Sequence, residues 1–284
     1  MPDHLVLLLD APLCAFGGDI IDAYGVVRDF PGRSTVTGLL ANALGYDRAD
    51  GALLDRLQAR LVLGSARVAE GRRVRDFQTA RLGAGDRGWT TRGRVEGRSG
   101  GAATYDSPHI RYRDADADAL VLVAFHLDPP EESPTLAEIE GALDRPERPL
   151  FIGRKPCLPS RPLVAGRIAS NDIRTALDLA LAACAAGTER FRLHPSRLRQ
   201  TPDGWPRSER RVRAQWPADL GQADLGQADL GPADLGQADR APGERERRLD
   251  MCDERDWVVG VHGGSRGVIE GRLCLPARTH GETP

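Results

Sequence analysis

Two short motifs place cationic side chains where the backbone could hold a phosphate group. Residues 30–34 (Phe-Pro-Gly-Arg-Ser) precede a helical pattern, so Arg33 and Ser34 would stand at a helix N-terminus. Free N–H groups and the helix dipole attract anions there. Residues 153–155 (Gly-Arg-Lys) follow a short apolar run, and a glycine lets the backbone approach an anion beside two cations. Each motif also has a plainer interpretation, as a helix cap beside a solvated arginine and as a surface turn.

A third candidate site lies in residues 75–113, a segment with many arginines and glycines and few apolar residues. It begins with Asp-Phe-Gln-Thr at residues 76–79, which also suits a simple turn. Arginines with an interleaved aromatic residue suit a single-stranded nucleic acid, because the cations meet its backbone and the ring stacks on a base. The alternative interpretation is a solvated loop. The candidate contacts are Gln78, Thr79, Arg92, Arg94, Arg98 and Tyr105.

The distribution of charge supports contact with phosphate more than the total charge does. The formal net charge is −2, whereas nucleic-acid-binding domains are usually basic. Residues 67–113 nevertheless hold 11 arginines against 5 acidic residues, and residues 190–213 hold 8 against 2. Residues 114–147 hold 10 acidic residues and one arginine. One surface is therefore expected to meet phosphate and another not, unless the arginines reflect coding bias alone.

An RNA-cleaving site is the main catalytic alternative. A metal-independent endoribonuclease needs a base for the 2′-hydroxyl group and an acid or cation for the leaving group. His109, Tyr105 and Lys155 are the candidates for these roles. The six histidines are dispersed along the chain, and no cluster of carboxylates suits two metal ions. We therefore predict a protein without catalytic residues.

The cysteines and the apolar segments argue against several other classes of protein. The five cysteines are odd in number and lack CxxC spacing, which predicts reduced thiols rather than a disulfide framework or a zinc ribbon. We therefore expect neither a metal nor a cofactor. No apolar stretch approaches the roughly 18 residues of a membrane span, and residues 5–9 are too short for a signal-peptide core. The chain is expected to be cytoplasmic and without membrane contact.

The apolar pattern predicts a mixed α+β fold. Ser34 and Thr135 would cap two of the helices, and Gly45 would end the first. The order strand, helix, strand, strand, helix, strand is the ferredoxin-like (RRM-like) βαββαβ arrangement. We assign it to residues 1–165, with a long thumb hairpin over about residues 77–112. The expected strands are 5–9, 62–68, 120–125 and 150–152, and the expected helices are 34–44, 53–61 and 135–143.

A smaller C-terminal region, residues 166–284, is expected to follow. Residues 172–184 predict a helix, and residues 257–261 predict a final strand. Residues 218–239 repeat Ala-Asp-Leu-Gly-Gln four times, with Pro232 in place of one Gln. A five-residue period matches neither a helix nor a strand, so we interpret this insert as flexible, low in complexity and exposed.

In combination, the motifs resemble the CasD family, the type I-E CRISPR Cascade subunit within the RAMP superfamily. Residues 11–17 resemble the family's Gly-Pro-Met-Gln-Ser-Trp-Gly loop. The Phe-Pro-x-Arg-Ser helix start, Asp-Phe-x-Thr at 76–79, Tyr-Arg-Asp-Ala at 112–115 and Gly-Arg-Lys-x-Cys at 153–157 occur in the family's order. Asp-Trp-Val-Val at 256–259 is similar to the family's Glu-Trp-Tyr-Val ending.

The resemblance is strong over residues 5–163 and patchy beyond, and three of its positions differ from the family pattern. Ala11, Phe16 and Gln78 stand where the family has Gly, Trp and His. The five-residue repeat has no counterpart in the family.

The resemblance implies a non-catalytic RNA-binding subunit that holds the 5′ handle of the guide RNA (crRNA) and packs its thumb against the neighbouring backbone subunit. By motif, Arg33, Ser34, Arg154 and Lys155 would face the handle, with the thumb arginines near the first spacer nucleotides. The other implied partners are the large PAM-reading subunit and the remaining Cascade subunits, with target DNA reached indirectly. An assembly scaffold without RNA affinity of its own stays open as an alternative.

Overall fold

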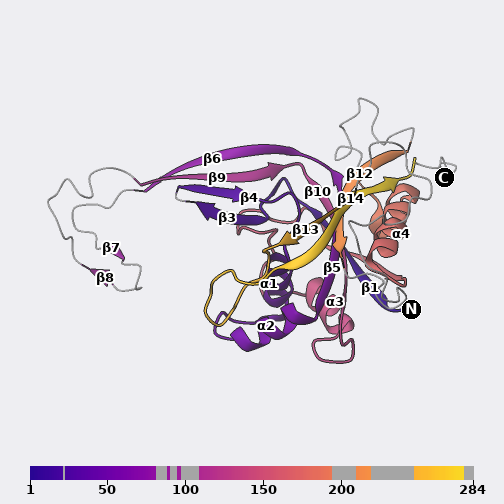
Figure 1. The fold of residues 1–284 in the computed structure, drawn as a ribbon, viewed down its shortest axis with the longest axis horizontal. Coiled ribbons are helices and arrows are strands. Elements are labelled where there is room, and N and C mark those ends of the chain that lie inside the picture. The colour runs from indigo at the N-terminus through magenta and orange to yellow at the C-terminus, as the bar shows by residue number, and fades with distance from the viewer. Residues whose placement is uncertain are drawn as a thin grey trace, which may run out of the picture.

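A computed structural model describes residues 1–21, 23–80, 88–89, 95–96, 109–193, 209–218 and 246–277, and the statements below concern these residues (Figure 1). The fold combines α-helices with two large β-sheets, which confirms the predicted α+β class. Within these residues, no helix is long and apolar enough to cross a membrane.

A seven-stranded sheet forms the centre of the molecule, with the strand order β11-β1-β10-β5-β12-β14-β13. Every neighbouring pair in it is antiparallel. The expected domain boundary at residue 165 lies within β11. Strands β12 to β14 belong to the same sheet as β1. The division into two regions stays a prediction. The strands are β1 (Asp3–Asp10), β5 (Leu61–Ala69), β10 (Leu120–Leu127), β11 (Val164–Ala169), β12 (Arg210–Pro217), β13 (Arg247–Met251) and β14 (Arg266–Leu275).

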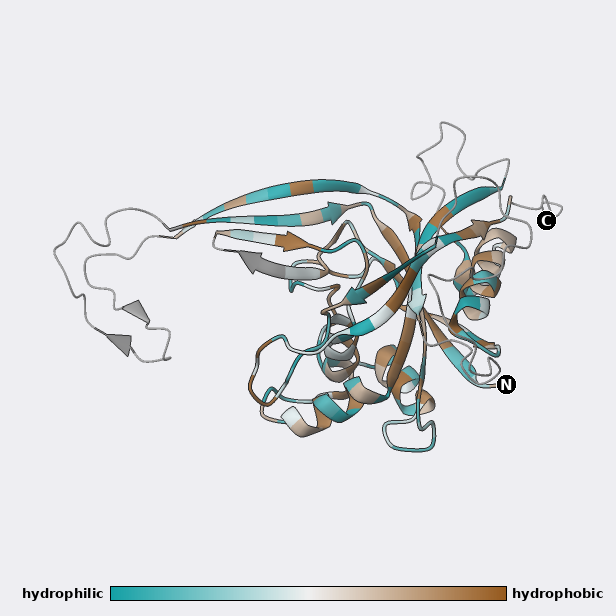
Figure 2. Cartoon of the chain, viewed as in Figure 1, coloured by the Kyte–Doolittle hydropathy of each residue, from teal (hydrophilic) through white to brown (hydrophobic). Residues whose placement is uncertain are grey.

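Strand β1 separates two hydrophobic cores, because successive side chains of a strand point to opposite faces of its sheet. Leu5, Leu7 and Leu9 pack in a core with α1, α2 and α3, whereas Val6 and Leu8 pack in a core with α4. Figures 1 and 2 show helices on either side of strands that are largely apolar. The helices are α1 (Arg33–Leu44), α2 (Gly51–Arg60), α3 (Leu136–Asp144), α4 (Ile173–Ala186) and the short 3-10 helix η2 (Glu189–Phe191).

A second sheet extends away from the body (Figure 1). Strands β6 and β9, here called the arm, pair along their whole length, and β4 runs parallel to β9 on its other side. The expected thumb, residues 77–112, begins within β6 and ends within β9. The strands are β2 (Leu13–Cys14), β3 (Gly17–Ile21), β4 (Tyr24–Val27), β6 (Arg72–Ala80) and β9 (His109–Ala117), with a separate pair β7 (Gly88–Trp89) and β8 (Val95–Glu96).

Ion pairs fix the root of the arm to the body. Arg67 of β5 and Asp116 of β9 lie 3.2 Å apart, with side chains 2% and 4% exposed. The second carboxylate oxygen of Asp116 accepts a hydrogen bond from Nε of Arg73 in β6 at 2.7 Å. Asp29 lies 3.1 Å from Arg73 and 2.8 Å from Arg213 of β12. One network of charges therefore joins both arm strands to two strands of the central sheet.

The helix ends agree with the sequence in two of three cases. Gly45 ends α1 in the left-handed region with φ 83°, and Thr135 forms the capping box of α3, as predicted. The predicted Ser34 cap is wrong, because α1 begins one residue earlier and no side chain of the helix caps it. Instead, Oδ2 of Asp253 accepts the N–H of Arg33 at 2.9 Å. The side chain of Asp253, which is remote in sequence, therefore caps the helix N-terminus.

Two short predicted strands are also wrong. Residues 150–152 form no strand, and β11 pairs with β1 at that edge of the sheet. Residues 257–261 form a turn, and the final strand is β14. A short apolar run forms a strand only where a neighbouring strand is available for pairing, which local pattern does not reveal.

Two histidines face each other across the pair β1 and β10. The ring centroids of His4 and His126 lie 4.9 Å apart, edge to face, and His4 is fully buried. Burial lowers the pKa of both imidazoles, and the neighbouring His4 lowers that of His126 further. Such a group binds a proton more readily in the unfolded chain, where its pKa is about 6.5. Its contribution to stability is therefore complete above that pH and is lost as the pH falls below it.

We expect acid to destabilise the protein partly through this pair. Between pH 7.5 and pH 5, the midpoint of urea unfolding should fall more for the wild type than for the double variant His4→Gln/His126→Gln. This window lies above the range in which the carboxylates of Asp29 and Asp114, whose pKa values are lowered, become protonated. Parallel pH profiles for the two proteins would show that the imidazoles contribute nothing.

Candidate nucleic-acid interface

A cleft of about 390 Å³ lies where four segments distant in sequence meet. Three of them contain the motifs at residues 11–17, 30–34 and 153–157, and the fourth is the loop 255–262, which contains the Asp-Trp-Val-Val motif. Polar groups and aromatic rings share the cleft, which suits a ligand with both flat and polar parts. The lining residues are Gly17, Ser34, Thr35, Gly38, Leu39, Asn42, Phe151, Gly153, Arg255, Trp257 and His262.

The turn 153–157 packs directly on the loop 11–17. Gly153 has φ 88°, and a Cβ atom there would lie 1.8 Å from the carbonyl oxygen of Ala15, so only glycine fits. The N–H of Ala15 donates to the carbonyl oxygen of Ile152 at 3.2 Å, and the N–H of Ile152 donates to that of Cys157 at 2.8 Å. These contacts fix the direction in which the following Arg154 and Lys155 leave the turn.

Arg154 and Lys155 have different environments. The guanidinium of Arg154 donates to the carbonyl oxygens of Asp114 at 2.8 Å and Gly25 at 3.1 Å, so it ties the turn to β9 and β4. Burial lowers its pKa, and the nearby Arg113 lowers it further. Lys155 is exposed and has no ion pair or hydrogen bond within the described part of the chain. Of the two, the ammonium group of Lys155 is available to an anion.

The N-terminus of α1 is already occupied by a carboxylate of the protein itself, that of Asp253. Besides accepting from Arg33, Asp253 accepts the N–H of Ser34 through its carbonyl oxygen at 2.9 Å. Asp253 is 3% exposed and also binds Arg266, with 2.9 Å between Nη2 and Oδ2. The guanidinium of Arg33 pairs with Glu254 at 2.6 Å, and burial lowers its pKa. The N–H groups that the sequence argument took to be free are therefore occupied, while Ser34 still lines the cleft.

One face of the arm is basic. Because strand side chains alternate, Asp76 and Gln78 of β6 share a face with Arg111 and Arg113 of β9, to which they are paired. Nε of Arg113 donates to Oε1 of Gln78 at 2.8 Å, and Nε2 of Gln78 donates to Asp76 at 2.8 Å. Gln78 thus holds an exposed guanidinium in place. We call this the basic face, and its two arginines belong to the arginine-rich segment 75–113 that the sequence marked as a candidate site.

The opposite face of the arm is aromatic. Tyr24, Tyr112 and Phe77 stand opposite one another on β4, β9 and β6. The two tyrosine rings are stacked with centroids 5.0 Å apart, and Phe77 lies 5.6 Å from Tyr112. Arg75 lies over both tyrosines at 5.6 and 5.9 Å. Thr79 belongs to this face by register, so it points away from the side that Gln78 occupies.

The loop 255–262 supplies cleft residues that sequence reasoning missed. The N–H of Trp257 donates to Asp55 at 2.9 Å and its indole Nε1 donates to Gln58 at 3.1 Å, both on α2. Arg255 lies over the indole at 5.2 Å. The available signal was the family-like Asp-Trp-Val-Val at residues 256–259, but residues 257–261 had been interpreted as a strand.

Several predicted contacts lie outside the described residues. These are Arg92, Arg94, Arg98 and Tyr105, and the same holds for the side chain of His109. No group of three or more histidine, cysteine, aspartate or glutamate side chains suited to a metal ion occurs in the described segments.

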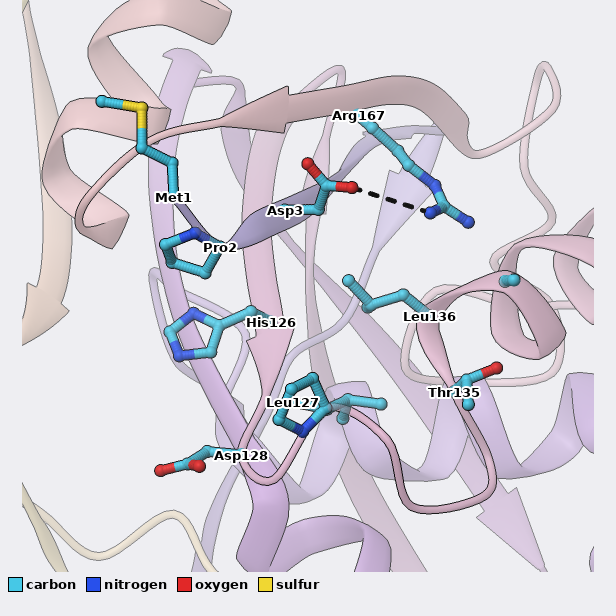
Figure 3. A pocket seen from close by; sticks show the side chains of 11 residues that line it. Met1, Pro2, Asp3, His126, Leu127, Asp128, Thr135, Leu136 and Arg167 are labelled. Carbon is cyan, nitrogen blue, oxygen red and sulfur yellow. Dashed lines mark ion pairs between the residues drawn. The ribbon is translucent and has the colours of Figure 1, made fainter.

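A second hollow, of about 540 Å³, lies at the start of β1 and contains none of the predicted contacts (Figure 3). Asp3 and Arg167 approach to 4.0 Å on its wall, where His126 and Leu136 also lie. Its wall is mixed in character and shares no residue with the cleft beside α1.

Comparison with known proteins agrees with this arrangement. Residues 4–228 match the model of the family described as CRISPR-associated protein (Cas_Cas5). The chain belongs to the Cas5 family. One relative is the CRISPR system Cascade subunit CasD of Escherichia coli (strain K12). Its sequence is 28% identical to this chain over 188 residues, which are 62% of this chain and 76% of that protein. The resemblance to CasD noted in the sequence is therefore confirmed.

Solved structures share the fold with this Cas5 chain. A chain of a CRISPR RNA-guided surveillance complex superposes with a TM-score of 0.58 at 18% identity, covering 97% of this chain and 90% of the other. A crystal structure of a Cas protein gives a TM-score of 0.50 at 20% identity, covering 96% and 95%. The likeness extends over almost the whole chain and includes strands on both sides of residue 165.

Proposed function

We propose that the protein is a non-catalytic RNA-binding subunit of a type I-E CRISPR surveillance complex and holds the 5′ handle of the crRNA. The observation that carries the proposal is the cleft in which three separate family motifs meet a fourth segment bearing a tryptophan. Membership of the Cas5 family and likeness to a Cascade subunit support it.

The chemistry of the cleft suits an unpaired RNA strand. Lys155 and the basic face supply cations for phosphates, and Gly17, with nothing within 4 Å of a Cβ placed there, leaves space for RNA backbone to approach. Trp257 offers a ring for stacking, and Ser34 and Asn42 offer hydrogen bonds to base edges. In this proposal Arg33 and Arg154 contribute indirectly. Arg33 holds the loop 252–266 in place, and Arg154 holds the turn 153–157.

The remaining family features follow as parts of the same proposal. The order β11-β1-β10-β5, with α1 and α2 before β5 and α3 before β11, supports a ferredoxin-like unit. The arm would pack against the neighbouring backbone subunit, and the large PAM-reading subunit would lie close to the handle. Target DNA would be reached only through the crRNA, and the complex would act in the cytoplasm.

The proposal is tested by incubating end-labelled repeat RNA, without metal ions, with the chain alone and with the complex purified through a tag on this chain. We expect uncut RNA with the lone chain and a protected 5′ handle in the complex. A discrete cut at the base of the repeat hairpin by the lone chain would make it the processing nuclease instead. A complex without crRNA protection would support a scaffold.

Replacing Lys155 by Ala should weaken handle binding without affecting the fold. The ammonium group is exposed, so the melting temperature should stay unchanged, while the slope of log affinity against log salt should become shallower by about 0.7 for one lost phosphate contact. Filter binding at several salt concentrations measures both affinity and slope. Replacing Arg145, exposed at the end of α3, by Ala is the matched control. An unchanged slope would remove Lys155 from the interface.

A further inference from the structure

The guanidinium of Arg113 on the basic face is held by a neutral group. Its Nε donates to Oε1 of Gln78, and it has no ion pair and no further hydrogen bond with the described residues. By contrast, Arg75 on the aromatic face of the same arm lies 2.7 Å from Asp114. The positive charge of Arg113 is therefore not matched by a carboxylate in contact, and the two terminal nitrogens of its fork are left for a ligand.

The amide of Gln78 is itself fixed in orientation. Its Nε2 donates to Oδ2 of Asp76 at 2.8 Å, which turns Oε1 toward Arg113. A free arginine side chain samples many rotamers and loses that freedom when it binds a ligand. The chain of hydrogen bonds from Asp76 through Gln78 to Arg113 removes part of this freedom in advance, which favours binding.

A second guanidinium lies beside that of Arg113. Gly25 of β4 pairs with Arg113, and a Cβ atom placed on Gly25 would lie 3.8 Å from Cγ of Arg113 and 3.4 Å from Nη2 of Arg154. Arg154 donates to two neutral acceptors, the carbonyl oxygens of Asp114 and Gly25. Burial lowers the pKa of Arg154, and the positive charge of Arg113 lowers it further. Two cations bonded to neutral groups at one place attract an anion.

The arrangement of these cations suits a chain of phosphates. The planar fork of an arginine donates two parallel hydrogen bonds to two phosphate oxygens, and a second cation nearby adds attraction without a contact. Arg111 shares the face two residues along β9, about 7 Å from Arg113. The exposed Lys155 follows Arg154 in the sequence. Cations repeated in this way match a ligand whose negative charge also repeats, as in a nucleic-acid backbone.

We propose that Arg113 binds a phosphate group of the unpaired RNA strand on the basic face, beside Arg154. Gln78, which the sequence suggested as an RNA contact, is then a positioning residue that acts through Arg113 and touches no RNA itself. This inference rests on the proposed function, because the strand is taken to be RNA held by this subunit. It adds which cation binds a phosphate directly and which side chain orients that cation.

Filter binding of the full-length chain to oligouridine, which has phosphates but no handle sequence, tests the phosphate contact. Arg113→Ala should bind about tenfold more weakly, with a slope of log affinity against log salt that is shallower by about 0.7. Arg113→Lys should keep the slope but not the full affinity, because lysine keeps the charge and loses the fork. Arg145→Ala, which removes an exposed arginine of α3, is the control and should bind as the wild type does.

A double-mutant cycle tests the role of Gln78. Gln78→Ala should weaken binding about threefold in the wild-type chain and have no effect in the Arg113→Ala chain, because the residue acts only through the arginine. Both side chains are exposed, so the melting temperature should stay unchanged. Equal losses in the two backgrounds would show that Gln78 contacts RNA itself, which would overturn its positioning role.

The inference and the proposed function fail in different ways. Wild-type affinity and slope in Arg113→Ala would overturn the phosphate site, while a protected handle in the complex would still support the proposed function. A wild-type chain that bound neither oligouridine nor repeat RNA would contradict both. Binding of polyglutamate in place of RNA, lost in Arg113→Ala, would assign the arginine to an acidic protein partner and overturn the inference.

Discussion

Replacing Asp116 by Asn is expected to lower the free energy of unfolding by about 3 kcal/mol, because one partner of a buried ion pair is removed while Arg67 stays enclosed and charged. The amide keeps the size of the side chain but not its charge, and its one remaining acceptor oxygen cannot serve both Arg67 and Arg73, which bind different oxygens of Asp116. Glu70, 3.0 Å from Nε of Arg67, remains as a second partner of Arg67. The loss of stability should therefore lie at the lower end of the range for broken buried ion pairs.

Urea unfolding measures this change, and Asp144→Asn is the control. Asp144 is exposed at the end of α3, where a neutral amide should alter stability by no more than about 0.5 kcal/mol. Because the network joins the arm to the body, amide hydrogen exchange in β6 should also accelerate in Asp116→Asn. Equal stability of the two variants would mean that water already satisfies Arg67.

Replacing Gly153 by Ala is expected to remove both stability and handle binding. The left-handed backbone costs an L-residue about 1–2 kcal/mol, and the clash with Ala15 adds to it, so a loss of about 2–4 kcal/mol should result. The turn must also move away from the loop 11–17. Lys155 would move with it, and handle affinity should fall by about tenfold or more.

Gly141→Ala supplies a control of opposite sign. Gly141 lies in α3 with open space around its Cα, and alanine there should raise stability by about 0.5–1 kcal/mol. Thermal unfolding and filter binding should be measured on both variants. If Gly153→Ala kept its affinity at temperatures where it is folded, the turn would not take part in binding.

Much of the fold was predictable because its strands and helices have strong local patterns. The runs at residues 5–9 and 120–125 fall inside β1 and β10, and the helix predicted at 172–184 matches α4 except for Asp172, which is its N-cap. The wrong predictions, residues 150–152 and 257–261, are short apolar runs next to glycine. Their conformation depends on strands elsewhere in the chain, and no local pattern carries that information.

The segments that form the site were predictable from the sequence, but the roles of their individual side chains were not. The glycine turn and the start of α1 are local motifs, and both border the cleft. The partners of Arg33 and Arg154 are not local: Glu254 is 221 residues from Arg33, and Asp114 is 40 residues from Arg154. Which cation meets a ligand and which holds the protein together is therefore decided by tertiary contacts.

The place of β1 in the central sheet has a consequence for synthesis. Leu5 pairs with Phe125 on one side and with Arg167 on the other, so β1 must wait for partners that leave the ribosome much later. Until then, an apolar strand with unpaired edges is exposed to other chains. Slow closure of such distant contacts favours aggregation during rapid expression. Lower temperature or a chaperone during translation should therefore raise the yield of folded protein.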